Sequence, residues 1–305
     1  MKQILVLTFL IFCSLQSASQ FFPQQSLYTY NMLSINGAAA GKDNALTATL
    51  GSRSMWRGVQ GAPVTHYLSM HSPLKEERIA LGLQVMSDKI GVSKRTGIFA
   101  TGAYRIQLNA KGKIAFALTA GMSSVTNGWS QIATTQSDDI TFSNGDQSYW
   151  MPNIGASIFY HDNQSFAGIS IPHFLTETYS GGGVYKADHQ MSNYSYHLMA
   201  GSKISMTELA YIKPAILLKY HTRSSMQTDA TIMGGIQRIG EIGFTYRHRQ
   251  AMVFVANARV NAQLNVAYSY DYLTGPIGNF ARGTHEFALL YTFQYHNNSP
   301  DTRFF

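Results

Sequence analysis

Cysteine is nearly absent from this sequence of 305 residues: its one cysteine, Cys13, lies near the N-terminus. Cys13 ends an apolar stretch that begins at Ile4, follows Lys2 and precedes the small residues Ser17 to Ser19. This order is typical of a secretory signal peptide that is cut before Gln20. The apolar stretch is shorter than the roughly 18 residues that a membrane-spanning helix needs. The mature chain then holds no cysteine, which excludes disulfides, thiol catalysis and thiolate metal ligands.

Charge is scarce as well, with charged residues making up 13% of the chain, compared with about 25% in soluble domains. The net charge of +7 falls to +6 when Lys2 is removed with the signal, and the basic residues are scattered along the chain. A nucleic-acid-binding protein concentrates them on one face, so we expect no nucleic-acid partner. A mean hydropathy of −0.10 excludes a bundle of membrane-spanning helices. It is compatible with a membrane β-barrel, whose lumen-facing side chains are polar.

What the sequence does contain is an alternation of apolar and polar residues with a period of two. In the stretch Gln263–Tyr272 the apolar face consists of Leu264, Val266, Tyr268, Tyr270 and Tyr272. A β-strand places successive side chains on opposite faces, so this pattern predicts a strand with one apolar and one mostly polar face. About fourteen such segments follow one another, many of them near the length of a tilted membrane strand: 45–55, 64–71, 78–87, 96–108, 113–124, 150–160, 165–171, 194–205, 211–222, 226–238, 241–249, 251–260, 263–272 and 284–295.

The lengths of the connections support a membrane barrel independently. If the first strand starts in the periplasm, every turn at the periplasmic end is short. The longer connections then fall at the opposite end, as in outer-membrane barrels: 56–63, 88–95, 125–149, 173–193 and 273–283. A soluble sandwich of two sheets has no reason to sort loop length in this way.

The mostly small polar-face residues also favour the barrel over the sandwich. In one strand that face is Ala115, Ala117, Thr119 and Gly121, which suits a filled or narrow lumen better than a hydrated charged exterior. We therefore predict an all-β transmembrane antiparallel barrel of about fourteen strands. Its parts are a signal peptide (1–19), an N-terminal periplasmic arm or plug (20–44), the barrel (45–295) and a C-terminal tail (296–305).

No pattern in the sequence indicates catalysis, a cofactor or a metal. The histidines lack zinc-protease spacing, and His161 falls in a predicted turn. Asp138, Asp139 and Asp146 share one long loop, but their spacing is not that of an EF-hand. Arg247 and Arg249 alternate within a predicted strand and could face the lumen or a membrane rim.

Several motifs run in order from the arm to the last segment. They include Asn31 and Asn36 in the arm; Trp56, Gly58, Gly61 and Pro63 in the segment 54–63; Asp88, Lys89 and Gly91 in the segment 87–91; Tyr270 in the segment 268–272; and Gly283, His285 and Glu286 in the segment 283–286. Through these motifs and their order, the chain resembles PorP/SprF-type proteins over nearly its whole mature length. It departs from the family where the arm has Asn31-Met-Leu-Ser-Ile-Asn36 in place of an aromatic–Asn–Pro cluster.

The resemblance implies an outer-membrane component of the type IX secretion system of Bacteroidota. Such proteins are implicated in exporting or surface-anchoring cargo and adhesins, some of them tied to gliding. It also implies as partners the outer-membrane lipid, cargo C-terminal domains and other secretion or motility proteins, and it provides no catalytic residues.

The residues themselves suggest a non-enzymatic docking platform. A barrel of about fourteen strands is narrower than the porins with wide channels, and an arm of roughly twenty-five residues could fill part of it. The long loops carry residue types that are enriched in binding hot spots: Trp129, Tyr149, Tyr179 and Tyr185. The alternatives are aromatic residues that pack on their own rim, and a FadL-like outer-membrane transporter of small or hydrophobic solutes.

Overall fold

The computed structural model describes residues 23–74, 77–132, 145–179, 185–221 and 224–293. The predicted signal peptide (1–19) and C-terminal tail (296–305) lie outside these residues. Within the described part, helices are single 3-10 turns, and none is long and apolar enough to cross a membrane.

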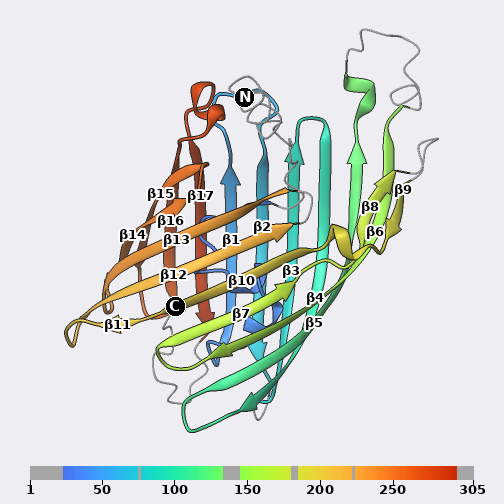
Figure 1. Cartoon of the computed structure of the whole chain (residues 1–305). Helices are drawn as coiled ribbons and strands as arrows, with labels where there is room; N and C mark the ends of the chain where they lie inside the picture. The colour runs from blue at the N-terminus through green and yellow to red at the C-terminus, as the bar shows by residue number, and fades with distance from the viewer. Residues whose placement is uncertain (1–22, 75–76, 133–144, 180–184, 222–223, 294–305) are drawn as a thin grey trace, which may run out of the picture.

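Fourteen antiparallel strands form one closed barrel (Figure 1), in agreement with the prediction. The strands are β1 (Leu46–Ser54), β2 (Val64–Pro73), β3 (Ile79–Ile90), β4 (Ser93–Gln107), β5 (Lys113–Asn127), β6 (Gln147–His161), β7 (Ser165–Ile171), β10 (Ser195–Ser202) with its continuation β11 (Ile204–Ser205), β12 (Ala210–His221), β13 (Ser224–Ile236), β14 (Gly240–Arg247), β15 (Ala251–Arg259), β16 (Leu264–Leu273) and β17 (Thr284–Phe293). Pairing of β1 with β17 closes the barrel, from Leu46 opposite Phe293 to Ser54 opposite His285. Closure joins the two outermost strands of the sheet, as a membrane barrel requires.

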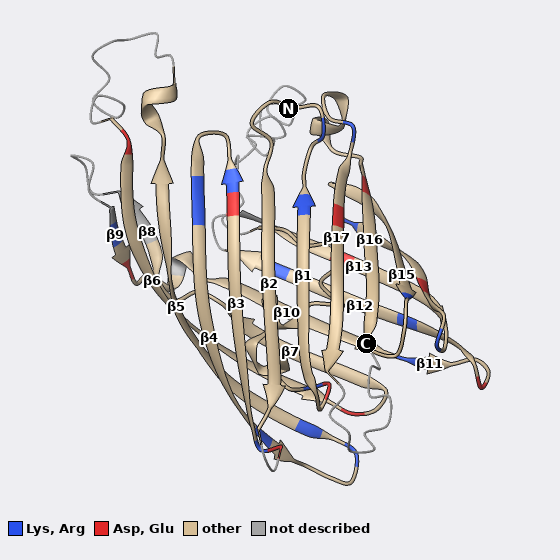
Figure 2. Cartoon of the chain, turned by 180° about the vertical axis from the view of Figure 1, so that it is seen from behind, with Lys and Arg blue, Asp and Glu red and all other residues tan. Residues whose placement is uncertain are grey.

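The two faces of each strand separate as the alternation predicts. Large apolar side chains point outward and remain exposed, among them Leu118 (66%) and Ile242 (73%). The inward positions of the same strands are small or polar, such as Ala117 and Thr245. Along β1 to β5, charged residues lie toward the strand ends and the middle is uncharged (Figure 2). This distribution fits lipid on the outside, where a charge at mid-depth costs about 2–4 kcal/mol.

We call the two rims of the barrel the turn end and the loop end. The turn end carries short connections such as 260–263, between β15 and β16. The loop end carries the connections 128–146 and 172–194, the second of which holds a small hairpin of β8 (Thr176–Tyr179) and β9 (Tyr185–Asp188). The predicted sorting of long connections to one end is therefore confirmed.

Two of the predicted loops are shorter than expected. The segment 88–95 is not a loop, because Asp88 pairs with Arg95 and only Gly91 and Val92 lie between β3 and β4. Gly91 has a φ of +58°, which suits a two-residue hairpin turn. Likewise, β5 and β6 continue their pairing as far as Asn127, so Tyr149 belongs to β6 instead of a loop.

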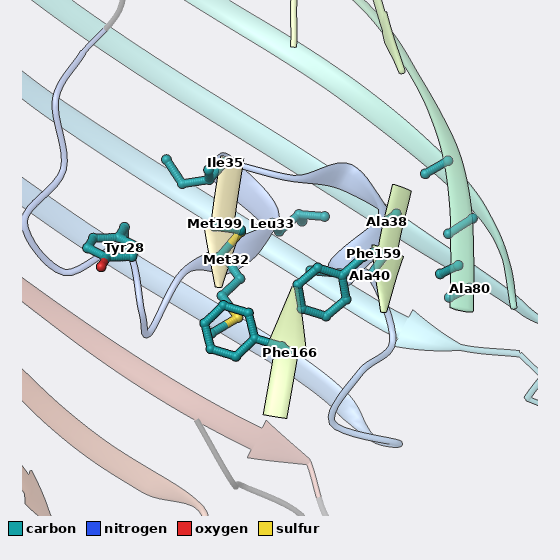
Figure 3. Packing of buried hydrophobic residues seen from close by; sticks show 14 of the residues in the cluster. Tyr28, Met32, Leu33, Ile35, Ala38, Ala40, Ala80, Phe159, Phe166 and Met199 are labelled. Atoms are coloured by element: carbon teal, nitrogen blue, oxygen red, sulfur yellow. The ribbon is translucent and has the colours of Figure 1, made fainter. Parts of the chain in front are cut away.

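The arm, residues 23–44 in the described part, lies inside the barrel. Its side chains pack against inward residues of the strands: Tyr28, Met32, Leu33, Ile35, Ala38 and Ala40 meet Ala80, Phe159, Phe166 and Met199 (Figure 3). Two 3-10 turns, η1 (Met32–Ser34) and η2 (Gly37–Ala39), shorten the segment. The arm therefore fills the lumen with an apolar core of its own.

The direction of the arm differs from the expectation that it faces the periplasm. Gln24 donates a 2.9 Å hydrogen bond from Nε2 to Gln250 Oε1, in the loop-end turn between β14 and β15. At its other end, the backbone N–H of Gly41 donates to His71 Nδ1 (3.2 Å), near the turn end of β2. These two hydrogen bonds place the start of the arm at the loop end and its last part at the turn end. The arm thus runs through the lumen from the loop end to the turn end.

Candidate functional site: the arm and its anchors

Five charged residues inside the barrel hold the start of the arm. They come from five different strands and are all at most 1% exposed: Arg53, Asp229, Arg247, Asp271 and Glu286. We call this set, together with Ser26 of the arm, the loop-end anchor. Each of the five occupies an inward position near the loop end of its strand, and closure of the barrel brings them together.

Two arginines bridge the three carboxylates. Arg53 donates to Asp271 Oδ2 (2.7 Å) and to Glu286 Oε2 (2.9 Å). Arg247 donates to the same Asp271 oxygen (2.9 Å) and, through Nε and Nη2, to Asp229 (3.1 and 3.0 Å). Such charge-assisted hydrogen bonds are the strong ones in proteins, and a buried arginine needs several acceptors.

Ser26 joins the arm to this anchor. Its backbone N–H donates to Glu286 Oε2 (2.7 Å), and its hydroxyl donates to Asp271 Oδ1 (2.9 Å). The same hydroxyl oxygen accepts from Arg53 Nη1 (2.9 Å) and from Arg247 Nη2 (3.2 Å). One arm residue therefore contacts four of the five charged residues.

A second anchor holds the middle of the arm. The hydroxyl of Tyr30 donates to Glu241 Oε2 (2.7 Å), while Glu241 Oε1 accepts from Lys213 Nζ (2.5 Å) and from the hydroxyl of Tyr211 (2.7 Å). Glu241 thus satisfies three donors, one of which comes from the arm. The carboxylate of Glu241 is thus compensated by hydrogen bonds, as a buried charge requires.

The third anchor lies at the turn end. Arg105 donates from Nη1 to the backbone oxygen of Gly41 (2.5 Å) and from Nε to that of Glu77 (2.7 Å). Asp43 forms an ion pair with Lys42 (2.7 Å). A hydrogen bond from Lys113 holds the pKa of the Glu77 carboxyl, in the β2–β3 turn, below its usual value.

Both asparagines of the arm motif are buried. Asn36 donates from Nδ2 to the backbone oxygens of Ile158 (3.0 Å) and Ile169 (3.2 Å), and its Oδ1 accepts from the backbone of Ala38 (3.0 Å). Asn36 therefore caps η2 and fastens it to β6 and β7. Asn31 donates a 3.4 Å hydrogen bond from Nδ2 to Gln25 Oε1, which also belongs to the arm.

The glycine and aromatic motifs meet around the loop end. The backbone of Arg57, next to Trp56, exchanges hydrogen bonds with Gly283 and Arg282. The backbone N–H of Gly91 donates to Gly61 (2.8 Å). Gly58, Gly61, Gly91 and Gly283 all have positive φ angles, as does Trp56. The motifs that are far apart in the sequence thus form one rim over the start of the arm.

The remaining motif residues stand beside that rim. Glu286 belongs to the loop-end anchor, and its neighbour His285 accepts or donates a 2.8 Å hydrogen bond with the Tyr268 hydroxyl. Tyr270 donates to the backbone oxygen of Arg282 (3.2 Å). Three other members have smaller roles: Pro63 accepts from the backbone of Met55, Asp88 accepts from Thr65, and Lys89 is exposed.

Replacement of Gly283 by alanine should destabilise the rim. Gly283 has a φ of +96°, and an added Cβ would lie 2.7 Å from the Tyr270 ring. We expect the unfolding free energy to fall by about 1–3 kcal/mol, measured by urea titration of the heat-modifiable band on gels. Gly102→Ala is the matched control, because an added Cβ there meets nothing within 4 Å. Equal effects of the two substitutions would contradict this role for Gly283.

The four loop aromatics lie on different elements of the loop end. Trp129 is half-buried in a 3-10 turn (Trp129–Gln131), and Tyr149 is half-buried in β6. Tyr179 and Tyr185 face each other in register as the last and first residues of β8 and β9. The central part of the first loop, with Asp138 and Asp139, lies outside the described residues, and Asp146 accepts hydrogen bonds from Ser130.

The anchors were not predicted from the sequence, although one signal was present. Four charged residues occur on the polar faces of the predicted strands: Arg53, Asp229, Asp271 and Glu286. A charge that points into a closed lumen needs a partner of opposite charge. For Arg247 the sequence is compatible with the lumen and with the rim. The structure places it in the lumen, whereas Arg249 is exposed in the following turn. Among the described residues, no group of three or more acidic, histidine or cysteine side chains is arranged to hold a metal.

A closed barrel with an apolar outer face, short turns at one end and a lumen filled by its own N-terminal arm defines a plugged β-barrel membrane protein. Residues 17–291 match the family model for the type IX secretion system membrane protein PorP/SprF, and the chain belongs to this family. A comparison with curated proteins finds no match.

Solved structures of similar fold are outer-membrane-type channels and transporters. The chain resembles the CymD monoaromatic hydrocarbon channel at 13% identity, over 84% of this chain and 90% of that one, with a TM-score of 0.50. It resembles a Pseudomonas aeruginosa FadL homologue at 10% identity, over 90% and 95%, with a TM-score of 0.50. It resembles the Ralstonia pickettii toluene transporter TbuX at 8% identity, over 88% and 94%, with a TM-score of 0.53. At these identities the likeness shows the fold alone.

Proposed function

We propose that this protein is a non-enzymatic docking platform of the type IX secretion or gliding machinery in the outer membrane. In this role the barrel holds cargo or adhesin proteins, through their C-terminal domains, during secretion or surface attachment. The predicted signal peptide (1–19) delivers the chain through the Sec pathway. The loop end, with Trp129, Tyr149, Tyr179 and Tyr185, faces the cell surface and supplies the contact area for cargo and for other secretion or motility proteins.

The plugged lumen is the observation that carries this proposal. Three anchors fix the arm near its start, middle and end, and they include charges that are almost fully buried. Apolar arm residues such as Tyr28 (0% exposed) and Met32 (2%) fill the space between the anchors. A polypeptide cargo cannot pass through a lumen filled in this way, so the protein acts on cargo at a rim.

A transporter of small or hydrophobic solutes is the second candidate. It is favoured by the fold shared with hydrocarbon channels and by a cavity between the arm and the loop end. A small solute can pass a plug that shifts slightly, whereas a protein cannot. The two candidates therefore differ in whether the arm has to move.

Locking the arm by a disulfide tests the proposal. A Cβ atom at Gly37 would lie 2.7 Å from Thr119 Oγ1 on β5, so Gly37→Cys with Thr119→Cys can form a bond across this contact. The mature chain is expected to contain no other cysteine. We expect the cross-linked barrel to support normal export and surface attachment of cargo, measured by mass spectrometry of culture fluid and cell-surface proteins. We also expect cargo to co-purify with it.

The matched control is a disulfide in the wall that leaves the arm free. Gly102 on β4 faces Leu118 on β5 in the register, and both lie on the outer face. If export stops in the oxidised Gly37–Thr119 variant, recovers on reduction, and is normal in the Gly102→Cys/Leu118→Cys variant, then the arm must move and the platform proposal is wrong.

A further inference from the structure

A cavity of about 210 Å³ lies in the lumen between the arm and the loop end. The arm forms its floor with Leu33, Ser34 and Ile35, and the strands form its walls. This volume is below the roughly 300–1,000 Å³ of pockets for drug-sized ligands. A ligand of this cavity is therefore small.

Lys219 is the one charged residue, with histidines taken as neutral, among the described residues that line the cavity. It occupies an inward position of β12, and its side chain is half-buried in the lumen. Within the described part of the chain, its ammonium group has no hydrogen bond or ion pair. Its register partner on β13 is Gln227, and the Asp229 carboxylate beyond it acts on Lys219 only through space, without an ion pair. An ammonium group that faces a cavity without an ion pair of its own can bind the anionic group of a ligand.

The wall across the cavity carries two large apolar side chains. Met86 on β3 and Phe99 on β4 line it, and Phe99 makes an edge contact with the His173 ring at 5.9 Å. Around the barrel, β3 and β12 are separated by six steps in one direction and eight in the other. The cation and the apolar wall therefore stand on opposite sides of the lumen, so one ligand can touch both at once.

We propose that this cavity binds a small amphiphile with one anionic head group, whose carboxylate accepts hydrogen bonds from Lys219 and whose chain crosses to Met86 and Phe99. Gln227 and Gln250, which also line the cavity, can donate amide hydrogen bonds to the same head group. The ligand would rest on Ile35 and so be in contact with the arm. This inference concerns ligand binding by the barrel itself and goes beyond the docking role.

The position of Lys219 next to the loop-end anchor has to be separated from ligand binding. The anchor sets two arginines against three carboxylates, and Asp229 and Glu286 act on Lys219 through space. Lys219 could therefore serve only to balance this charge. In that case its replacement would weaken the barrel without changing the affinity for an amphiphile.

Binding of octanoate, labelled at the carboxyl carbon, tests the proposal on the full mature chain in lipid nanodiscs, with empty nanodiscs subtracted. We expect saturable binding to the wild-type protein, and at least about tenfold weaker binding to Lys219→Met, since hydrogen bonds to a charged donor are lost. Lys219→Arg keeps the charge and should keep most of the affinity. Lys94→Met, an exposed loop-end lysine on β4, is the matched control and should bind as the wild type does.

A ligand series on the wild-type protein provides a test that does not depend on any variant folding. Octanamide, with the same chain and no charge, should bind at least about tenfold more weakly than octanoate, and acetate should fail to compete. Equal binding of octanoate and octanamide, competition by acetate alone, or unchanged affinity in Lys219→Met would each overturn the proposal. These results are independent of cargo export, so failure here leaves the docking role untouched.

Discussion

Replacing Arg247 by methionine is expected to detach the start of the arm and destabilise the barrel by about 3–5 kcal/mol, as removal of one partner from a buried charge network does. Arg247 donates to Asp229, Asp271 and Ser26. Methionine has a similar reach and no donor, so Asp229 would be left buried without its arginine. We expect a lower urea midpoint for the heat-modifiable band and faster protease cleavage near residue 26.

Arg249→Met is the matched control for this variant. Arg249 is exposed in the turn that follows β14, and a surface charge contributes about 0–1 kcal/mol. If both variants unfold at the same urea concentration, the anchor does not stabilise the barrel.

The double variant Arg247→Met/Asp229→Leu distinguishes two contributions to stability: the cost of leaving one buried charge unpaired, and the net contribution of the ion pair. Asp229 accepts three hydrogen bonds from Arg247 and one from Gln227. Replacement of both partners by apolar residues of similar size is often close to neutral. We therefore expect the double variant to be more stable than Arg247→Met alone. A simple sum of the two single effects would mean that the pair is not coupled.

The barrel could be predicted from the sequence because its signals are local. In the stretch from Gln263 to Tyr272, alternation identifies both the strand and its outer face, and the same residues point outward in β16. Lipid requires every outward position to be apolar, so the pattern repeats in strand after strand. The loop-end boundaries were less accurate, because β3–β4 and β5–β6 extend beyond the apolar band with polar pairs such as Thr126 and Ser148. Outside that band, alternation no longer marks a strand.

The anchors could not be predicted because they depend on the register of the whole barrel. Arg53 and Glu286 are 233 residues apart, yet they face each other across the seam between β1 and β17. The depth of each inward residue in the lumen follows from the stagger of all intervening strands. The arm added a second obstacle, since its residues have no clean period. Its path from the loop end is determined by Ser26, an unremarkable residue in the sequence that contacts four charges only in the folded chain.

Removal of the arm should produce the largest change of all, an open pore. We expect deletion of residues 24–41 to convert a non-conducting barrel into one that carries ions in planar lipid bilayers, because the segment that the three anchors hold and its apolar side chains would leave the lumen together. The exposed lumen wall is largely polar or small, with Thr101, Thr231 and Ser269 among its buried residues, so water can fill it. A 14-stranded barrel has space for water once its plug is gone.

A second variant replaces residues 24–41 by glycine and serine residues of the same number. It shows whether the lumen is closed by the mere presence of a chain or by the specific contacts of the arm. Such an arm keeps the chain in the lumen but lacks Leu27, Tyr28 and Met32, whose side chains are at most 2% exposed, and burial of each such side chain stabilises by about 1.5–3 kcal/mol. We expect intermittent conductance from this variant, steady conductance from the deletion, and none from the wild type. If the deletion remains closed, loop-end segments and not the arm seal the barrel. If the wild type already conducts, the plug is permeable, and transport of small solutes becomes the favoured function.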